Sequence, residues 1–213
     1  MTTLNMPAQN LYVSNHPLVK HKLTALRDVD TNYRDFRSLV KELAMLLCYE
    51  ATQDMPLTSR QVQTPLTTAD GFRSKDIGVV PILRAGLGML EGVIMLLPNV
   101  QVWHVGLRRD EETLQPITYY NRLPSVADIE FCLVLDPMLA TGGSAVACVN
   151  MLKQSGVNHI KYMGLIAAPE GVAHLHKAHP DVAIHVGALD SHLNEKGYIV
   201  PGLGDAGDRQ FGT

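Results

Sequence analysis

The chain has 213 residues, 46% hydrophobic and 18% charged, a length that suits one domain with a substantial core. Its formal net charge of -3 leaves no overall positive field that would collect nucleic acid or anionic lipid. The apolar runs are too short to span a membrane, and residues 1–10 lack the basic segment and apolar run of a signal peptide. We therefore expect a soluble, cytoplasmic protein that binds neither nucleic acid nor membrane.

Cysteine and histidine, which often mark disulfides or metal sites, have ordinary explanations here. The three cysteines are odd in number, widely spaced and set among apolar neighbours, which indicates reduced core residues rather than disulfides or a zinc site. His174, His176 and His179 fall in a predicted helix, where only His176 and His179 can share a face. Because a metal site needs converging side chains, we interpret these histidines as a solvated helix end.

The first 75 residues are predicted to form two helices and an outlying strand. Asn15-His16-Pro17 is typical of a helix start, because proline has no N–H to satisfy in the first turn. From Thr31, a good N-cap, apolar residues recur at helical spacing and predict a helix of about five turns. These residues are Phe36, Leu39, Val40, Leu43, Leu47 and Ala51. The stretch 57–67 alternates loosely and contains a proline, which indicates an edge hairpin or strand outside the main sheet.

After Asp76 the sequence alternates between short buried strands and helices. Five apolar runs rich in Val and Ile are predicted as strands buried on both faces: 77–83, 101–107, 130–135, 160–167 and 182–189. Helices are predicted between them at 86–97, 143–155 and 170–178. This alternation predicts an α/β fold, an open and mostly parallel sheet flanked by helices. We expect a single domain, 1–213, with N-terminal additions in 1–75, an α/β core in 76–190 and a C-terminal segment in 191–213.

The segment 134–144 runs from a buried strand, through Asp136, into a Thr-Gly-Gly turn that opens a helix. A phosphate monoester needs backbone N–H groups aimed at one point, and a glycine-containing turn supplies them at the positive end of the helix dipole. Thr141 and Ser144 add hydroxyl donors. The Asp136 carboxylate repels phosphate, so its expected partners are sugar hydroxyls or a magnesium ion. The two halves together predict binding of a ribose 5-phosphate.

Other interpretations explain these residues less well. A P-loop needs a lysine directly after its glycines and a dinucleotide fingerprint needs Gly-x-Gly-x-x-Gly, and the segment has neither. A plain strand, turn and helix explains an isolated Thr-Gly-Gly equally well, but explains all eleven residues poorly. Ligands of open α/β sheets bind beyond the carboxyl ends of the strands, where Arg84 is expected beside a small-residue turn that suits an anion. The alternative for Arg84 is a surface ion pair.

Three separated motifs carry a family resemblance. The segment 134–144 resembles the phosphoribosyl pyrophosphate (PRPP) motif of type I phosphoribosyltransferases, although Pro137 replaces the second acidic residue of many members. Together with 81–87 and 197–209, it resembles the uracil phosphoribosyltransferases over nearly the whole chain from about residue 15. The resemblance implies transfer of the 5-phosphoribosyl group from PRPP to uracil, giving UMP and pyrophosphate in pyrimidine salvage. It also implies Mg2+ bound mainly through PRPP and water, a homodimer or higher homo-oligomer, and GTP as a candidate allosteric effector.

The same resemblance assigns the site residues. Those expected to bind PRPP are Arg84, Arg109, Asp136, Pro137, Met138, Leu139, Ala140, Thr141, Gly142, Gly143, Ser144 and Asp205. Uracil presents an acceptor, donor, acceptor edge, and the residues expected to bind it, mainly through backbone groups, are Ile199, Gly204, Asp205 and Ala206. Asp136, Arg109 and Asp205 are the expected catalytic residues, with Asp205 reaching the magnesium through water. The general base stays open between Asp205 and the departing pyrophosphate.

Two further segments fit this assignment, and two rival functions remain. The charged run 108–124 is expected to contain a mobile hood that closes over the substrate and excludes water. The last 17 residues contain five glycines, but Tyr198, Ile199 and Leu203 make them too apolar for a solvated linker. The first rival is an RNA-binding regulator on the same fold, which the acidic net charge disfavours. The second is a uracil or UMP sensor without turnover, which the intact site residues disfavour.

Overall fold

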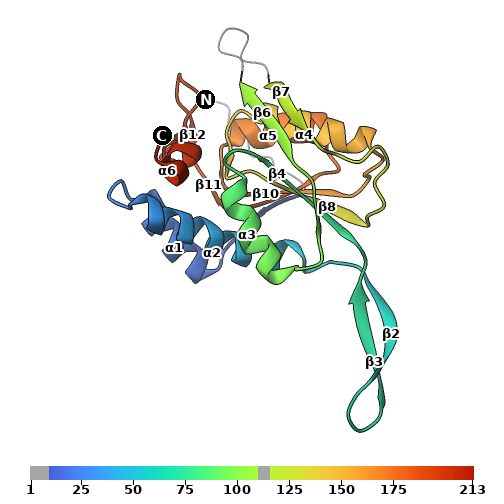
Figure 1. Ribbon diagram of the computed structural model, residues 1–213. Coiled ribbons are helices and arrows are strands. Elements are labelled where there is room, and N and C mark those ends of the chain that lie inside the picture. Colours follow the sequence, from blue (N-terminus) through green and yellow to red (C-terminus); the bar gives the residue numbers. More distant parts are fainter. Residues whose placement is uncertain (1–9, 110–115) are drawn as a thin grey trace.

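A nine-stranded, mostly parallel sheet forms the centre of the protein (Figure 1). The computed structural model describes residues 10–109 and 116–213. The strands are β1 Leu11–Val13, β4 Ile77–Leu83, β5 Gln101–Val102, β6 Val105–Arg109, β7 Pro116–Asn121, β8 Phe131–Leu135, β9 Met138–Leu139, β10 Ile160–Ala167 and β11 Ala183–Leu189. They lie in the order β1-β11-β10-β8-β4-β6-β7, with β5 beside β4 and β9 beside β10. The prediction of an open, mostly parallel α/β sheet is confirmed, since the one antiparallel pair described in this sheet is β6 with β7.

Helices cover both faces of this sheet. They are α1 Pro17–Arg27, α2 Tyr33–Ala51, α3 Leu87–Leu96, α4 Gly143–Gln154, α5 Pro169–Ala178 and α6 Ala206–Phe211. The first three pack on one face, and α4 and α5 pack on the other. Alternation along β8 explains both layers, because Leu133 and Leu135 enter one core while Cys132 and Val134 enter the other.

Local hydrogen bonds decide where the N-terminal helices start. Pro17 begins α1, as predicted. The N-cap of α2 is Asn32, whose side chain accepts the Asp35 N–H (3.0 Å), so the prediction of Thr31 is wrong by one residue. Thr31 instead donates its hydroxyl to the Ala25 carbonyl oxygen (2.6 Å), which fixes the connection between the two helices.

The stretch around residues 57–67 forms most of a hairpin outside the main sheet. Its strands, β2 Leu57–Gln63 and β3 Thr68–Ser74, pair with each other in antiparallel register. Figure 1 shows the hairpin projecting away from the sheet and its helices. The prediction of a hairpin outside the sheet is therefore confirmed.

Three parts of the main sheet differ from the sequence prediction. The run 101–107 is two strands rather than one, because Trp103 and His104 interrupt it and the Trp103 N–H bonds to the Val79 carbonyl oxygen (3.0 Å). Strand β1 extends the sheet beside β11, and its three residues are too few for a periodic signal. Strand β7 lies within the charged run predicted to be a loop; residues 110–115 of that run lie outside the described residues.

The histidines of α5 also differ from expectation. His179 is 5% exposed, and the Nε2 atoms of His176 and His179 are buried without a hydrogen-bond partner among the described residues. Burial lowers the pKa of both rings, so both are neutral at pH 7. The interpretation of a solvated helix end is wrong for these two.

None of the described helices is long and apolar enough to cross a membrane.

Candidate functional site

Three of the predicted site segments meet at the carboxyl edge of the sheet. Strands β4 and β8 are parallel neighbours with Pro81 opposite Leu135, so Arg84 and Asp136 follow them at the same edge. Strand β6 pairs with the other side of β4 and brings the backbone of Arg109 to this edge. The Arg109 side chain is outside what the structure describes, and its contact with pyrophosphate stays a prediction.

The turn before α4 has the shape of an anion site. Gly142 has a φ of +82°, and a Cβ on it would lie 2.9 Å from the Gly171 carbonyl oxygen, so a larger residue does not fit. No described side chain caps α4, which leaves its first N–H groups available to a ligand. Thr141 and Ser144 lie beside them and are partly exposed. Sequence reasoning placed this turn correctly, because its signal is local.

His174 supports this turn, and sequence reasoning missed it. Its Nδ1 donates to the Thr141 carbonyl oxygen (2.7 Å), which orients the peptide just before Gly142. The residue comes from α5, one strand and one helix later in the chain, so spacing along the sequence gives no signal. Its contact arises from the packing of α5 beside α4.

Asp136 follows β8 and is held where its charge is poorly solvated. Tyr162 donates its hydroxyl to the Asp136 carbonyl oxygen (3.0 Å), and the Asp136 N–H donates to the Met163 carbonyl oxygen (3.2 Å). Burial raises the pKa of the Asp136 carboxyl to about 7, opposed by the Met138 N–H and reinforced by the charge of Asp205. A carboxyl poised near neutral pH at a ligand-binding edge is typical of a functional site.

Asp205 reaches the same place from the C-terminal segment. It is the N-cap of α6, where its Oδ1 accepts the Asp208 N–H (3.0 Å). It lines a pocket of about 270 Å3 whose other walls are Met138, Ala140, Lys196, Gly197, Tyr198 and Ile199. The pocket therefore joins the end of the phosphate turn to the segment predicted to bind uracil.

The uracil segment is a short hairpin followed by a glycine-rich turn. Strand β12 His192–Leu193 pairs with β13 Ile199–Val200, and the turn then leads into α6. Gly202 has a φ of +64°, and a Cβ there would lie 2.1 Å from the Ile199 carbonyl oxygen. Gly204 has a φ of +79°, and neither of its backbone groups is hydrogen-bonded to a described residue. The turn thus presents free backbone groups beside the pocket.

Lys196 and Tyr198 line the pocket, although the sequence analysis assigned them no contact with ligand. Both are exposed, and Lys196 lies in a polar turn that resembles any solvated loop. Because the β12–β13 hairpin folds over Met138 and Ala140, Lys196 and Tyr198 lie against the pocket.

Comparison with known proteins decides the family. The model of the family described as uracil phosphoribosyltransferase matches residues 13–213. The uracil phosphoribosyltransferase of Roseiflexus castenholzii is 60% identical over 206 residues, which are 96% of this chain and 99% of the relative. That of Bacillus licheniformis is 57% identical over 205 residues, 95% of this chain and 98% of the relative.

The chain belongs to the uracil phosphoribosyltransferase family. Membership makes it an enzyme that transfers a phosphoribosyl group to uracil, and the prediction from its three motifs is confirmed. Among solved structures, the AQ2163 protein from Aquifex aeolicus superposes with a TM-score of 0.90 at 40% identity, covering 94% of this chain and 97% of that one. An adenine phosphoribosyltransferase from Thermoanaerobacter pseudethanolicus, 12% identical with a TM-score of 0.55, shares the fold.

In this uracil phosphoribosyltransferase fold, Arg84 lies on a tight turn that α6 supports. A Cβ on Gly86 would lie 2.4 Å from the Leu135 carbonyl oxygen, so glycine lets the turn approach β8. Arg84 is exposed, and its guanidinium carbon lies 5.6 Å from the centre of the Phe211 ring of α6. Gln210, fully buried, donates to the Ala85 carbonyl oxygen (3.0 Å). Arg84 has no ion pair among the described residues, which disfavours the surface-pair interpretation.

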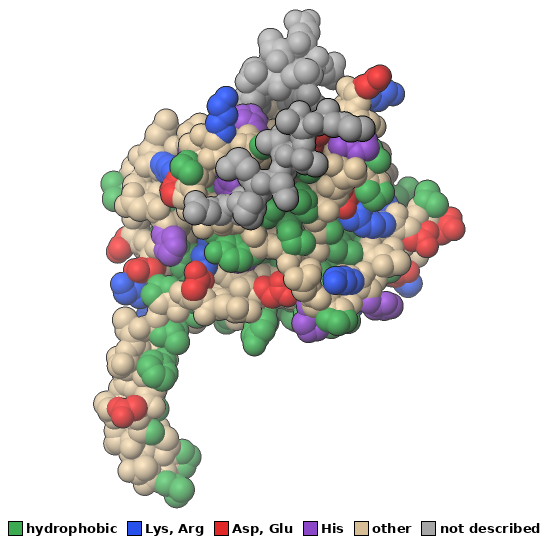
Figure 2. All heavy atoms as spheres, turned by 180° about the vertical axis from the view of Figure 1, so that it is seen from behind, with side chains coloured by type: hydrophobic (Ala, Val, Ile, Leu, Met, Phe, Trp, Pro, Cys, Tyr) green, Lys and Arg blue, Asp and Glu red, His purple; other side chains and the backbone are tan. Residues whose placement is uncertain are grey.

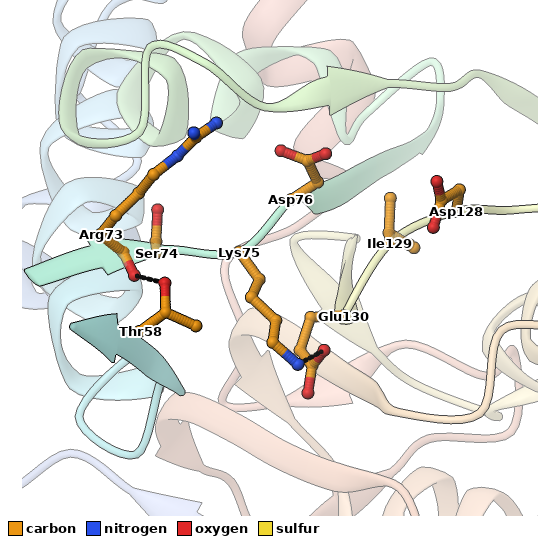
Figure 3. Close-up of a pocket in the computed structure, with 8 residues that line it drawn as sticks. All are labelled: Thr58, Arg73, Ser74, Lys75, Asp76, Asp128, Ile129 and Glu130. Carbon is orange, nitrogen blue, oxygen red and sulfur yellow. Dashed lines mark hydrogen bonds and ion pairs between the residues drawn. The ribbon is translucent and has the colours of Figure 1, made fainter. Parts of the chain in front are cut away.

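A second hollow, of about 390 Å3, lies at the base of the hairpin and is drawn in Figure 3. Asp76 and Glu130, which line it, directly precede β4 and β8, so it lies at the amino edge of the sheet. Lys75 pairs with Glu130 there (2.7 Å), which partly neutralises the lining. In open α/β sheets the ligand edge is the opposite one. The smaller pocket, which Asp205 lines at the carboxyl edge, is therefore the better candidate for the functional site.

Proposed function

We propose that the protein forms UMP and pyrophosphate from uracil and PRPP at the carboxyl edge of its sheet. The observation that carries this proposal is the single pocket lined by Ala140, from the phosphate turn, and by Ile199 and Asp205, from the uracil segment. Radiolabelled uracil incubated with PRPP and magnesium should yield labelled UMP. Bound uracil without UMP would favour a sensor, and retention of RNA at physiological salt would favour a regulator.

The proposed mechanism rests on positioning and charge. The anomeric carbon gains positive charge as pyrophosphate departs, so the enzyme must hold the sugar in line with uracil and stabilise the leaving group. Residues 140–144 at the start of α4 would hold the 5-phosphate, and Asp136 would accept hydrogen bonds from the ribose hydroxyls. Arg84 and Arg109 would bind the pyrophosphate. Ile199, Gly204 and Ala206 would read uracil through their backbone groups.

Mg2+ is proposed to enter with PRPP. The described residues contain no group of three or more His, Cys, Asp or Glu side chains that could hold a metal ion. Mg2+ commonly keeps several waters and takes one or two carboxylates plus substrate phosphates, so Asp136 and Asp205 fit it as partners. When bound, the ion neutralises charge on the departing pyrophosphate. Asp205 would act through a bound water.

Asp205→Asn separates the two candidates for the general base. Asparagine caps helices as well as aspartate does, so the melting temperature should stay close to that of the parent. If Asp205 takes the uracil proton, turnover should fall by about 100-fold or more. The matched control is Asp208→Asn in the same helix, which should keep its turnover. Normal turnover in Asp205→Asn would leave pyrophosphate as the proton acceptor.

We propose a homodimer or higher homo-oligomer that forms through the β2–β3 hairpin. Its side chains Leu66 and Phe72 are 95% and 70% exposed, and Figure 2 shows hydrophobic side chains along the projecting arm. An apolar arm exposed on a monomer is typical of an association surface. Phe72→Ser with Leu66→Ser should therefore reduce the sedimentation coefficient toward that of a monomer. Gln63→Ser on the same arm is the control, and unchanged assembly of the double variant would contradict this role.

We also propose a cytoplasmic location and regulation by GTP. The three cysteines are buried and free, which suits a reducing cytoplasm. GTP stays the proposed effector, and initial rates with and without GTP at subsaturating PRPP test it. Equal rates with and without GTP would rule out GTP as an effector.

A further inference from the structure

An ion pair remote from the pocket holds the middle of the uracil turn. Arg27, the last residue of α1, bonds to Asp190 through both guanidinium nitrogens, Nη1 to Oδ2 (2.7 Å) and Nη2 to Oδ1 (2.6 Å). The side chains of Arg27 and Asp190 are 24% and 5% exposed. A two-pronged pair with little solvent access is more rigid and stronger than an exposed one.

The pair forms hydrogen bonds with both backbone groups of one residue, Gly202. Its carbonyl oxygen accepts from Arg27 Nη1 (2.6 Å), and its N–H donates to Asp190 Oδ2 (3.0 Å). Gly202 lies between Ile199 and Gly204, two of the residues proposed to read uracil. With both backbone groups of Gly202 fixed, the residues on either side of it have little freedom to rotate.

A second arginine fixes the end of the same turn to the same helix. Arg209 Nη1 donates to the carbonyl oxygens of Leu203 and Leu26 (2.8 Å each), and Nη2 donates to that of Asp28. Its guanidinium carbon lies 4.5 Å from the centre of the Phe36 ring. The C-terminal end of α1 therefore holds the turn in place through hydrogen bonds. Figure 1 shows α6, which carries Arg209, beside α1 and α2.

We propose that Arg27 and Asp190 are positioning residues that set the affinity and selectivity for the base without touching it. This inference rests on the proposed function of the turn in binding uracil. The free groups of Gly204 must meet the fixed polarity of the uracil edge, and they do so only if the turn has one conformation. The described hydrogen bonds of this pair reach Gly202 and not the phosphate turn before α4, so PRPP binding should be independent of the pair.

The test compares Asp190→Asn and Arg27→Lys with the parent enzyme. Asparagine keeps the shape but replaces one acceptor oxygen with an NH2 donor, so it cannot accept from both guanidinium nitrogens of Arg27, and lysine keeps the charge but loses the two-pronged geometry. We expect the KM for uracil to rise by about 10- to 100-fold, with an unchanged KM for PRPP and a smaller preference for uracil over cytosine. Lys22→Met, which removes an α1 pair with Glu42, is the control and should change none of these values.

The readout separates positioning from mere stability. A purely structural role would lower the active fraction, and so the apparent kcat, while leaving both KM values and the base preference unchanged. If that pattern appears, or if both KM values rise equally, the inference is wrong. Should a single variant fail to fold because a buried charge is left unpaired, Arg27→Met with Asp190→Asn removes both charges and keeps the test.

A parallel variant distinguishes failure of this inference from failure of the site assignment. Gly204→Ala alters the turn itself, because alanine resists a φ of +79°. If Gly204→Ala raises the KM for uracil while the Arg27 and Asp190 variants do not, the inference alone fails. If Gly204→Ala also leaves the KM for uracil unchanged, the assignment of uracil to this turn fails with it.

Discussion

Asp136→Asn should lower turnover by about 30- to 1000-fold, because it removes a charge-assisted contact to the ribose that strengthens in the transition state. The purified variant is assayed for UMP formation at saturating uracil and PRPP. The control is Asp128→Asn, an exposed aspartate at the opposite edge of the sheet (Figure 3). Near-normal turnover in Asp136→Asn would remove this residue from the site.

The same variant should be at least as stable as the parent at neutral pH. The pKa of Asp136 is raised from 3.8 to about 7 in the folded protein, so folding favours the protonated carboxyl. That favourable contribution is fully present below about pH 4 and is lost as the pH rises through about 7. Asparagine stays neutral, so Asp136→Asn should gain about 1 to 3 kcal/mol relative to the parent between pH 4 and pH 8. Urea unfolding at both pH values measures it, and a loss of stability at pH 8 would contradict the burial argument.

Uracil should be accepted and cytosine rejected by more than about 100-fold in kcat/KM. Cytosine replaces the N3 donor with an acceptor and the O4 acceptor with an amine, so two buried hydrogen bonds become two repulsive contacts. Each unsatisfied buried group costs about 1 to 3 kcal/mol. Fixed backbone groups of Ile199, Gly204 and Ala206 cannot reverse their polarity to compensate, as a rotating amide side chain would.

A small halogen at the 5 position does not alter this edge, so 5-fluorouracil should be turned over at a rate close to that of uracil. The measurement compares uracil, 5-fluorouracil and cytosine at saturating PRPP and magnesium. Comparable rates for cytosine and uracil would overturn reading by the backbone. A preference for a purine or for orotate would overturn the proposed reaction itself.

The parts of the fold that could be predicted are those whose signal is local. Strands β4 and β10 match their predicted bounds, because burial on both faces leaves an apolar run that in β10 is interrupted only by Lys161. Strand β7 was missed because Tyr119 and Tyr120 are exposed and follow a charged run, which reads as a loop. His176 and His179 were misjudged because polar side chains at a helix end are usually solvated, and only tertiary packing buries them.

The candidate site likewise has parts with a local sequence signal and parts that only packing creates. The phosphate turn and Asp136 are contiguous in sequence and could be predicted from spacing. Two supporting hydrogen bonds could not be predicted: that of His174 to Thr141 and that of Gln210 to Ala85. Each joins segments that only the packed structure brings together. The role of Arg27 has no sequence signal for the same reason, because its partner, Asp190, directly follows β11, far from Arg27 in the chain.

The glycine turn that follows β13 reverses the usual pattern of mutational tolerance. In the core, a position tolerates change when the new side chain has the right size and polarity. At Gly202 and Gly204 the constraint is the backbone conformation, and at Gly202 every side chain would collide with the Ile199 carbonyl oxygen. A library of single substitutions would therefore map Gly202 and Gly204 as two positions that accept only glycine, a profile that marks recognition by the main chain.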